Sequence, residues 1–242
     1  MAHVSELWLY PVKSMQGLSV ASLELDQAGV AGDRRWALID ANSKLCSAKR
    51  YSKLFEASAS ADGTITLSGG DIANSDEALS EWLGTSVKLV ERAADTAVGY
   101  EMTFEPPNDE AEYYEIPSPI GTFLDLAGIH IVAASTLAYC AEQYPDLDWD
   151  VRRFRPNIVI DVDIEPFAED AWSGSNITIG DAVIHIDMPS VRCAMPLRGQ
   201  PGGLQRQPAM YAALDVLHNN HLGLYATVVQ PARINVGDMV VV

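Results

Sequence analysis

Short strand patterns that end at proline or glycine dominate this sequence and limit its fold more than any other feature. The opening stretch "HVSELWLYPV" alternates apolar and polar residues until Pro11, as a half-buried strand does. Comparable patterns follow in "WALID", "SVKLVERA", "RPNIVIDV", "NITIGDAVIHIDM" and "GLYATVVQPARINVGDMVVV". Their number predicts a mainly β protein, a barrel or a sandwich with helical additions.

Helical patterns are few and do not alternate regularly with the strands. The stretch "NSDEALSEWLG" predicts a short helix that Asn74 or Ser75 caps and Gly84 ends. The stretch "QPAMYAALDVLHNN" predicts a second helix, with a proline in its first turn. A third follows the apolar strand "GIHIVAA", where Ser135 or Thr136 is a suitable cap. The absence of βαβ alternation favours the mainly β class over a parallel α/β fold.

The length of the chain permits one large domain or two small ones, since domains mostly contain about 100–200 residues. Residues 95–120 are rich in acidic residues and proline and show little periodicity. We therefore predict a long loop, or a connection between two lobes, over this stretch.

The charge balance limits the partners of the protein. The chain has 33 acidic residues against 16 basic ones, a formal net charge of −17, which argues against binding to nucleic acids or anionic membranes. No apolar run approaches the roughly 20 residues of a membrane span. The N-terminus lacks the pattern of a secretory signal, and three cysteines are too few for a disulfide framework. We expect a cytoplasmic protein with reduced thiols.

The few basic residues gather where predicted strands end. They occur as Lys13 with Ser14, Arg34-Arg35, Lys49-Arg50, Arg152 and Arg153 with Arg155, and Arg192. Arginine and lysine at neighbouring strand ends, with serine and asparagine donors among them, suit a small ligand that carries several negative charges. The alternative is that each arginine pairs with an acidic residue at the surface. The clustering favours an anion-binding pocket.

Cys193 differs from the other two cysteines in its surroundings. A lone intracellular cysteine is usually a small buried hydrophobe, and this interpretation suits Cys46 and Cys140. Cys193 directly follows Arg192, and Arg198 comes five residues later. Cationic neighbours favour the thiolate, which is both the nucleophilic and the metal-binding form of cysteine. Charge alone leaves open whether Cys193 is a nucleophile or a metal ligand.

The histidines provide no comparable signal. The pair His218 and His221 has a short, metal-like spacing, but no cysteine or acidic residue stands at zinc-site spacing around it. We interpret it as the end of a helix and the following turn. His130 and His185 lie in alternating strand patterns and are predicted to be structural.

An ordered set of motifs resembles a known family. The stretches "YPVKSMQG", "GDRRWALID" and "LCSAKR" resemble the N-terminal β-barrel domain that accompanies MOSC domains. The later stretches "RFRPNIVI", "PFAEDAW", "ITIGDA", "VRC" and "LGLYATVVQPARINVGDMVVV" resemble the MOSC domain itself. The resemblance implies a mainly β fold, an N-terminal β-barrel lobe packed on a MOSC β-barrel lobe with a few helices. The expected division is 1–94 for the first lobe, 95–120 for a linker and 121–242 for the MOSC domain.

The resemblance also implies a ligand, because family members bind the molybdenum cofactor, a pterin that carries a dithiolene and a phosphate. Cys193 would ligate molybdenum or carry sulfur as a persulfide. The residues expected to bind the cofactor are Lys13, Ser14 and Arg34 from the first lobe, and Arg155, Asn157, Arg192 and Tyr225 from the second. Pyridoxal phosphate binding is also attached to the family as a whole and is carried over to no residue of this chain.

Two functions follow from the resemblance. The first is a molybdenum-dependent reductase of N-hydroxylated or related N-oxygenated small molecules, in which separate redox proteins supply electrons, because the chain ends without a cysteine-rich iron–sulfur segment. The alternative is a sulfur carrier, sulfurtransferase or cofactor carrier that uses Cys193 as a persulfide-forming thiolate. The stretch "AMPLRGQPGG" follows the cysteine, where the amidoxime-reducing members usually have Thr-Thr and Asp-Pro, so the substrate contacts differ.

Overall fold

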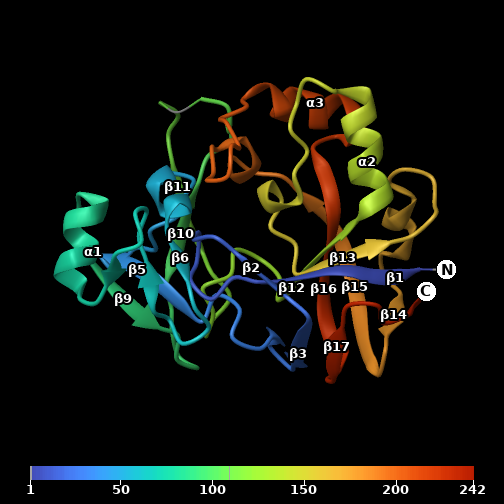
Figure 1. Ribbon diagram of the computed structural model, residues 1–242, viewed down its shortest axis with the longest axis horizontal. Coiled ribbons are helices and arrows are strands. Elements are labelled where there is room, and N and C mark those ends of the chain that lie inside the picture. The colour runs from blue at the N-terminus through green and yellow to red at the C-terminus, as the bar shows by residue number, and fades with distance from the viewer. Residues whose placement is uncertain (1, 109) are drawn as a thin grey trace.

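The protein is described here by a computed structural model, which covers residues 2–108 and 110–242 and contains two β-rich parts (Figure 1). The larger part is an eight-stranded sheet with two helices against it, and the smaller part holds several short sheets and one helix. The predicted fold class, mainly β with a few helices, is confirmed. Across the described ranges, no helix has both the length and the apolar character needed to cross a bilayer.

The large sheet curls into a barrel. Its strands follow the order β18-β14-β15-β16-β12-β13-β1-β2, and only β12 and β13 run parallel. The bridge between His3 and Met239 brings β1 next to the start of β18 and closes the barrel. The strands are β1 (His3–Leu9), β2 (Leu18–Val20), β12 (Ile129–Ala133), β13 (Ile158–Asp161), β14 (Asn176–Ile179), β15 (Ala182–Val191), β16 (His221–Gln230) and β18 (Val240–Val241).

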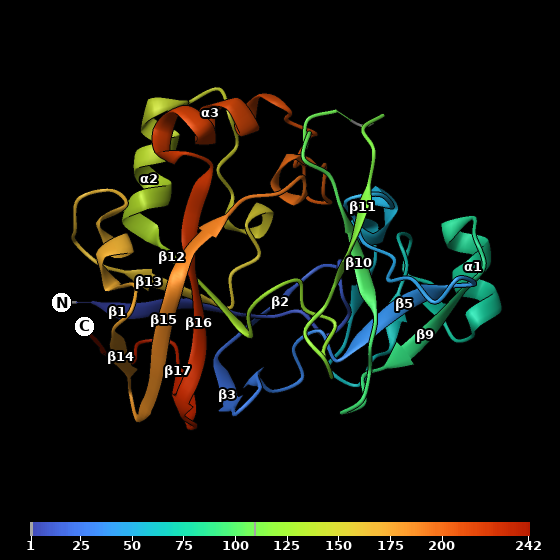
Figure 2. The same ribbon diagram turned by 180° about the vertical axis from the view of Figure 1, so that it is seen from behind.

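Alternation along these strands separates the barrel interior from the side that the helices cover. In β12, Ile129 and Ile131 belong to the interior core, whereas Val132 packs in the cluster under the helices. Successive side chains of a strand point to opposite faces, so the apolar runs of the sequence fill both sides. Figure 2 shows the long strands β15 and β16 side by side, with the helices beyond one end. These helices are α2 (Ala134–Gln143) and α3 (Ala209–His218).

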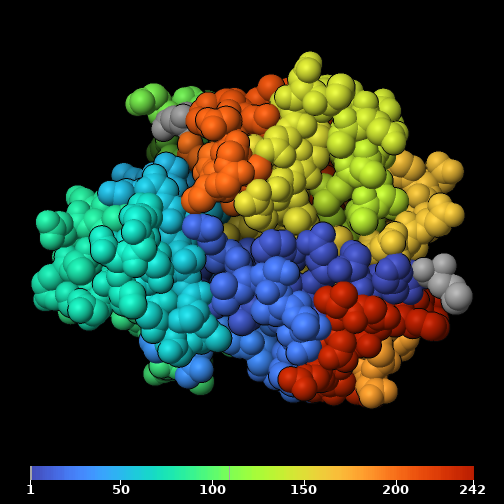
Figure 3. Space-filling view, in the orientation of Figure 1, coloured from blue at the N-terminus to red at the C-terminus, as the bar shows by residue number. Residues whose placement is uncertain are grey.

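The core of the larger barrel includes residues from the stretch expected to form the N-terminal lobe, namely Val4, Leu7, Leu23, Leu25 and Val30. Strand β1 lies between β13 and β2, and β3 (Ser22–Asp26) pairs with β17 (Arg233–Asn235) and with β4 (Gly29–Val30). The space-filling view shows the N-terminal segment, in dark blue, between the smaller part and the C-terminal half of the chain (Figure 3). The sheet of the larger barrel is therefore built from both ends of the chain.

The smaller part has its own apolar core. Leu38, Leu54, Phe55 and Leu79 are buried in it, and Met15 closes it toward the larger barrel. Its strands are β5 (Trp36–Asp40), β6 (Ser58–Ala59), β7 (Ile65–Thr66), β8 (Ile72–Ala73), β9 (Val87–Glu91), β10 (Gly99–Met102) and β11 (Tyr114–Pro117). Its helix is α1 (Asp76–Leu83), and the short 3₁₀ segments of the chain are η1 (Ser52–Glu56), η2 (Val151–Arg153), η3 (Ala168–Trp172) and η4 (Met195–Leu197).

Helix α1 forms as its sequence predicts. The Ser75 hydroxyl accepts a hydrogen bond from the Ala78 amide at 3.2 Å, and Gly84 ends the helix in a left-handed conformation. The caps predicted for α2 are wrong. That helix begins after Ala133 without a side-chain cap, and Thr136, buried inside it, donates its hydroxyl proton to Glu169 at 2.7 Å.

The loop predicted over residues 95–120 instead contains a hairpin, in which β10 pairs with β11. Each strand has four residues and β11 is largely exposed, so neither shows the apolar alternation that marks a strand in sequence. The hairpin leads into the irregular segment 118–128, which ends at β12.

Candidate functional site

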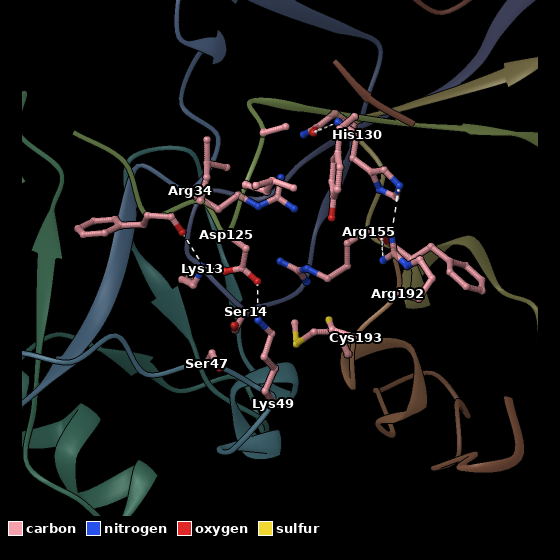
Figure 4. A pocket seen from close by; sticks show the side chains of 18 residues that line it. Lys13, Ser14, Arg34, Ser47, Lys49, Asp125, His130, Arg155, Arg192 and Cys193 are labelled. Carbon is pink, nitrogen blue, oxygen red and sulfur yellow. Dashed lines mark hydrogen bonds and ion pairs between the residues drawn. The ribbon is translucent and has the colours of Figure 1, made fainter. Parts of the chain in front are cut away.

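A pocket lies where the two β-rich parts meet, and strand ends and loops from both supply its walls (Figure 4). The structure brings all the predicted site residues to this pocket. They are Lys13, Ser14, Arg34, Arg155, Asn157, Arg192, Cys193 and Tyr225. Their shared location is a structural fact, whereas the role of each in binding or catalysis stays a prediction.

Cys193 is the thiol of the pocket. It lies two residues after β15 ends, just before η4, and it is half-buried. Cys46 and Cys140 are buried elsewhere, and burial raises the pKa of each to about 12, so both stay protonated at neutral pH. As the sequence predicts, these two cysteines are buried, and Cys193 is the one of the three that lines this pocket.

Backbone oxygens and neutral side chains hold Arg192. Its guanidinium donates to the Phe154 carbonyl at 3.1 Å, to the Ser190 hydroxyl at 2.8 Å and to the ring of His130 at 3.2 Å. Burial and the charge of Arg192 lower the pKa of His130 well below its usual value, so the ring stays neutral and can accept this bond. His130 therefore positions Arg192, a role that its strand pattern did not reveal.

Gly223 makes room for this arrangement. It has a φ of +84°, and a Cβ atom there would stand 2.6 Å from the His130 ring and 2.4 Å from the Ile131 carbonyl oxygen. A larger residue would push β16 away from β12 and displace His130.

Arg155 and Arg34 share the ring of Tyr10. Their guanidinium carbons lie 4.2 and 4.4 Å from its centroid. Arg155 donates to the Met15 carbonyl at 2.6 Å, whereas Arg34 pairs with the buried carboxylate of Asp33. Burial, together with the charge of Arg34, lowers the pKa of Arg155 to about 10. Among the described residues, neither Arg155 nor Arg192 forms an ion pair with a carboxylate.

The opposite wall of the pocket carries lysines that do share a carboxylate. Lys13 and Lys49 contact the two oxygens of Asp125 at 2.5 and 2.7 Å, and Lys13 also donates to the Phe123 carbonyl at 2.6 Å. Burial alone would raise the pKa of Asp125, but the two ammonium groups outweigh it and hold this pKa far below its usual range. We call Lys13, Lys49 and Asp125 the lysine side, and Arg155 and Arg192 the arginine side.

The paired basic residues of the sequence divide between the pocket and the surface. Three of these groups of basic residues each contribute one side chain to the pocket, namely Arg34, Lys49 and Arg155. Their neighbours bind carboxylates outside it. These ion pairs are Arg50 with Glu101, Arg35 with Glu91, Arg152 with Asp150, and the buried Arg153 with Asp148. The surface-pairing interpretation therefore holds for these four arginines, whereas anion binding by the basic residues of the pocket stays a prediction. Arg198 lies outside the pocket lining, and its guanidinium donates to the Lys49 carbonyl.

Three residues of the pocket have left-handed backbone conformations. Ser14, Arg34 and Arg155 have φ angles of 66°, 44° and 56°. Such conformations are costly for residues other than glycine and collect at functional sites, where the surrounding structure enforces them. They direct side chains from sharp turns at strand ends into the cavity.

Asn157 and Tyr225 line the pocket in different ways. The Asn157 amide accepts from the His130 backbone N–H at 3.2 Å and donates to the Trp8 carbonyl at 3.3 Å, so it mainly fixes β12 and β1. The Tyr225 ring stands 5.6 Å from that of His130, centroid to centroid. We expect Asn157 to shape the cavity through the strands it joins.

Several polar atoms of the lining still lack a partner. Ser47 Oγ, Arg155 Nη2 and Arg192 Nε are buried without a hydrogen bond to the described part of the chain. A buried polar atom without a partner costs about 1–3 kcal/mol, so these atoms are best explained by a ligand that binds them. In the described ranges, two guanidinium groups of the lining have no carboxylate partner, and a thiol lies nearby. Such a lining fits an anionic, phosphate-bearing ligand with a soft metal.

Sequence analysis missed four residues of this pocket, which are Asp125, His130, Ser47 and Lys49. Only Lys49 had a signal, its place at a strand end.

Comparison with known proteins agrees with this geometry. Residues 1–94 match the MOSC N-terminal beta barrel domain and residues 122–241 match the MOSC domain. The human mitochondrial amidoxime-reducing component 1 is 27% identical over 228 residues, which cover 79% of this chain and 65% of the human protein. The chain thus spans slightly less than two thirds of that relative. The mouse protein of the same name is 24% identical over 292 residues, covering 98% of this chain and 81% of the relative.

Two further similarities complete the comparison. The molybdenum cofactor sulfurase of Danio rerio is 27% identical over 236 residues, which cover 79% of this chain and 28% of the sulfurase. The crystal structure of the YuaD protein from Bacillus subtilis has the same fold, with a TM-score of 0.52 at 13% identity, over 99% of this chain and 93% of that one. The chain belongs to the MOSC family, which is associated with the molybdenum cofactor, and carries both the N-terminal beta barrel domain and the MOSC domain.

Proposed function

We propose that this protein binds the molybdenum cofactor in the pocket and reduces N-oxygenated small molecules, using electrons from separate redox proteins. The observation that carries the proposal is a thiol in a pocket where the guanidinium groups of Arg155 and Arg192 are buried and have no carboxylate partner among the residues that the structure describes. Such groups favour a phosphate-bearing ligand, and a thiolate favours a soft metal. The similarity to amidoxime-reducing components supports a reductase.

The residues divide the binding task between the two walls. Lys13, Ser14 and Arg34 would hold the phosphate and pterin from one wall, and Arg155 and Arg192 from the other. Cys193 would be the metal ligand. When bound, the cofactor would supply the two-electron chemistry of the reaction.

The remaining chemistry falls to the chain itself. Reduction of an N-hydroxy group to the amine takes up two electrons and two protons and releases one water. The pocket wall orients the substrate and keeps the positive charges in place. His130, neutral and bonded to Arg192, holds that guanidinium in one orientation without adding charge. Buried cations of fixed orientation stabilise negative charge more strongly than cations in water do.

Metal analysis of Cys193→Ala tests the proposal. The wild-type protein, expressed in a host that makes the cofactor, should contain close to one molybdenum and one pterin per chain, and it should reduce an amidoxime when given a chemical electron donor. Cys193→Ala should lose the molybdenum and the activity and keep its fold. Cys140→Ala, which removes a buried thiol outside the lining of this pocket, is the matched control and should keep both. Molybdenum and activity that persist in Cys193→Ala would rule out this role for the thiol.

A sulfur-carrying role is the second candidate, because the half-buried Cys193 thiol faces a lysine ammonium and one relative is a cofactor sulfurase. In that role Cys193 would accept sulfur from a donor persulfide, which would leave as a thiol. Mass spectrometry of the intact protein after incubation with a persulfide donor distinguishes the two. A gain of one sulfur atom at Cys193 in protein that binds no molybdenum would favour the carrier.

A further inference from the structure

We propose that Ser47 and Lys49 form an oxyanion subsite beside Cys193, which the Asp125 carboxylate fills in the free protein. The subsite would receive the negatively polarised N–O oxygen of the substrate, so its use in catalysis rests on the proposed function. Its affinity for an oxyanion does not depend on that function.

Ser47 carries the first argument. The residue is 3% exposed, its hydroxyl faces the pocket and it has no hydrogen-bond partner in the described part of the chain. Its carbonyl accepts the backbone N–H groups of Arg50 and Tyr51 at 3.0 and 2.8 Å, which fixes the turn that follows. The hydroxyl is therefore a donor held in place without an acceptor.

Lys49 carries the second argument, because both ends of the residue are held. Its carbonyl accepts from the Tyr113 hydroxyl at 2.9 Å and from Arg198. Its ammonium lies 4.3 Å from the centroid of the Tyr100 ring and interacts electrostatically with Cys193. Figure 4 shows Lys49 between Ser47 and Cys193. Although burial alone would lower the pKa of Lys49, Asp125 and Cys193 raise it, so the ammonium stays charged at neutral pH.

Asp125 carries the third argument, because it resembles a bound anion more than a fixed part of the wall. Its side chain is 35% exposed, against 7% and 4% for the side chains of Lys13 and Lys49 that it contacts. It belongs to the irregular segment before β12, and of the described lining residues it is the one that carries a carboxylate. Its two oxygens bind the same ammonium groups that an incoming oxyanion would use.

These three observations assign the subsite a specificity. A substrate oxygen that takes the place of one Asp125 oxygen receives hydrogen bonds from Lys49 and Ser47 and lies next to Cys193. Hydrogen bonds from a charged donor are about twice as strong as neutral ones. The site should therefore prefer substrates whose reacting oxygen is anionic or strongly polarised.

Sulfate binding to cofactor-free protein tests the subsite without any activity. Protein from a host that cannot make the cofactor would be titrated with sulfate at constant ionic strength and followed by calorimetry. Asp125→Asn should bind sulfate at least about tenfold more tightly, because the competing carboxylate is gone. Lys49→Met should bind it about tenfold more weakly, a change of about 1.4 kcal/mol. Lys88→Met, which removes an exposed lysine on β9, is the control and should bind as wild type.

The double variant separates local competition from a general change of charge. In Lys49→Met, the further change Asp125→Asn should give a clearly smaller gain, because Lys49 is missing and only Lys13 is still contested. An equal gain in both backgrounds would overturn the proposal, since it would mean that Asp125 acts on the arginine side at a distance.

Ser47→Ala adds a variant that folds easily. It should weaken sulfate binding and raise the melting temperature, because it removes a buried hydroxyl without a partner.

Kinetics of the cofactor-loaded protein connect the subsite to the reaction. Lys49→Met should raise KM for an amidoxime more than it lowers kcat, and Lys49→Arg should restore part of the loss. If the loaded protein reduces amidoximes while Lys49→Met binds sulfate as wild type does, the subsite is wrong and the proposed function stands. If the sulfate cycle succeeds and no amidoxime is reduced, the subsite stands and the proposed function is wrong.

Discussion

The two walls of the pocket handle buried positive charge in different ways. On the lysine side, Lys13 and Lys49 share the Asp125 carboxylate. On the arginine side, Arg155 and Arg192 bind carbonyl, hydroxyl and imidazole groups that carry no charge. A buried cation without a counterion destabilises a fold, whereas a paired one is close to neutral. The single carboxylate thus neutralises the lysine side in part in the free protein, and the arginine side is suited to a ligand that brings its own negative charge.

The largest expected effect breaks the arginine side. Arg155→Met should weaken cofactor retention at least about thirtyfold, because the loss of one partner of a buried charge pair costs about 2–5 kcal/mol. Molybdenum content after dialysis measures it. Arg152→Met is the matched control, because Arg152 pairs with Asp150 and does not line the pocket.

The same variant should have the opposite effect on the free protein. Since burial and Arg34 lower the pKa of Arg155 to about 10, its charge opposes folding at neutral pH, by an amount on the order of 3 kcal/mol. Loss of the bond to Met15 and of the contact with Tyr10 offsets part of this. We expect a net gain of about 1 kcal/mol, or about 2–4 °C in melting temperature. A cofactor-free Arg155→Met that melts below wild type would contradict the contrast between the walls.

The next effect breaks the lysine side. Asp125→Asn leaves two buried ammonium groups without a counterion and should lower the free energy of unfolding by about 2 kcal/mol, a value reduced for the partial exposure of Asp125. The folded pKa of Asp125 is far below its usual value, so its contribution is complete above about pH 4 and is lost as the pH falls further. Urea unfolding from pH 7 to pH 3 should show the two proteins converging below pH 4. A constant gap would show that Asp125 acts through packing.

The fold and the site could be predicted from the sequence to different depths. Ser75 and Gly84 mark helix α1 because capping depends on a few neighbouring residues. The basic residues at strand ends indicated a pocket because several strand ends and loops carry the same charge, whereas a shared location is what the structure adds. Asp125 gave no signal, since it is one acidic residue among 33 in a segment without periodicity. The pairing of β1 with β13 was equally hidden, because register between distant strands leaves no local pattern.

A smaller effect sharpens the role of His130. Its folded pKa lies well below the usual value, so the stability that depends on the neutral ring is complete above about pH 6.5 and declines as the pH falls below it. His130→Gln keeps an acceptor for Arg192 and does not titrate. Between pH 6.5 and pH 5, wild type should lose up to about 1.4 kcal/mol per pH unit more than the variant. Parallel pH profiles of unfolding would show that His130 is not the titrating group.

The smallest effect belongs to the surface partner of a site arginine. Arg35→Gln removes an exposed ion pair with Glu91 and should change the free energy of unfolding by less than about 1 kcal/mol, without loss of molybdenum. The substitution of the adjacent Arg34 should deplete the metal. Equal depletion by both would mean that the division of each basic pair between pocket and surface has no functional meaning.

The place of β1 in the larger barrel sets an order of events during folding. The Ser5 hydroxyl bonds to the carbonyl of Val159, 154 positions later, and the bridge from His3 to Met239 spans nearly the whole chain. During synthesis β1 is made long before its neighbour β13, and contacts of such separation form slowly. The pocket draws residues from Lys13 to Tyr225, so it forms only after β16 has been made.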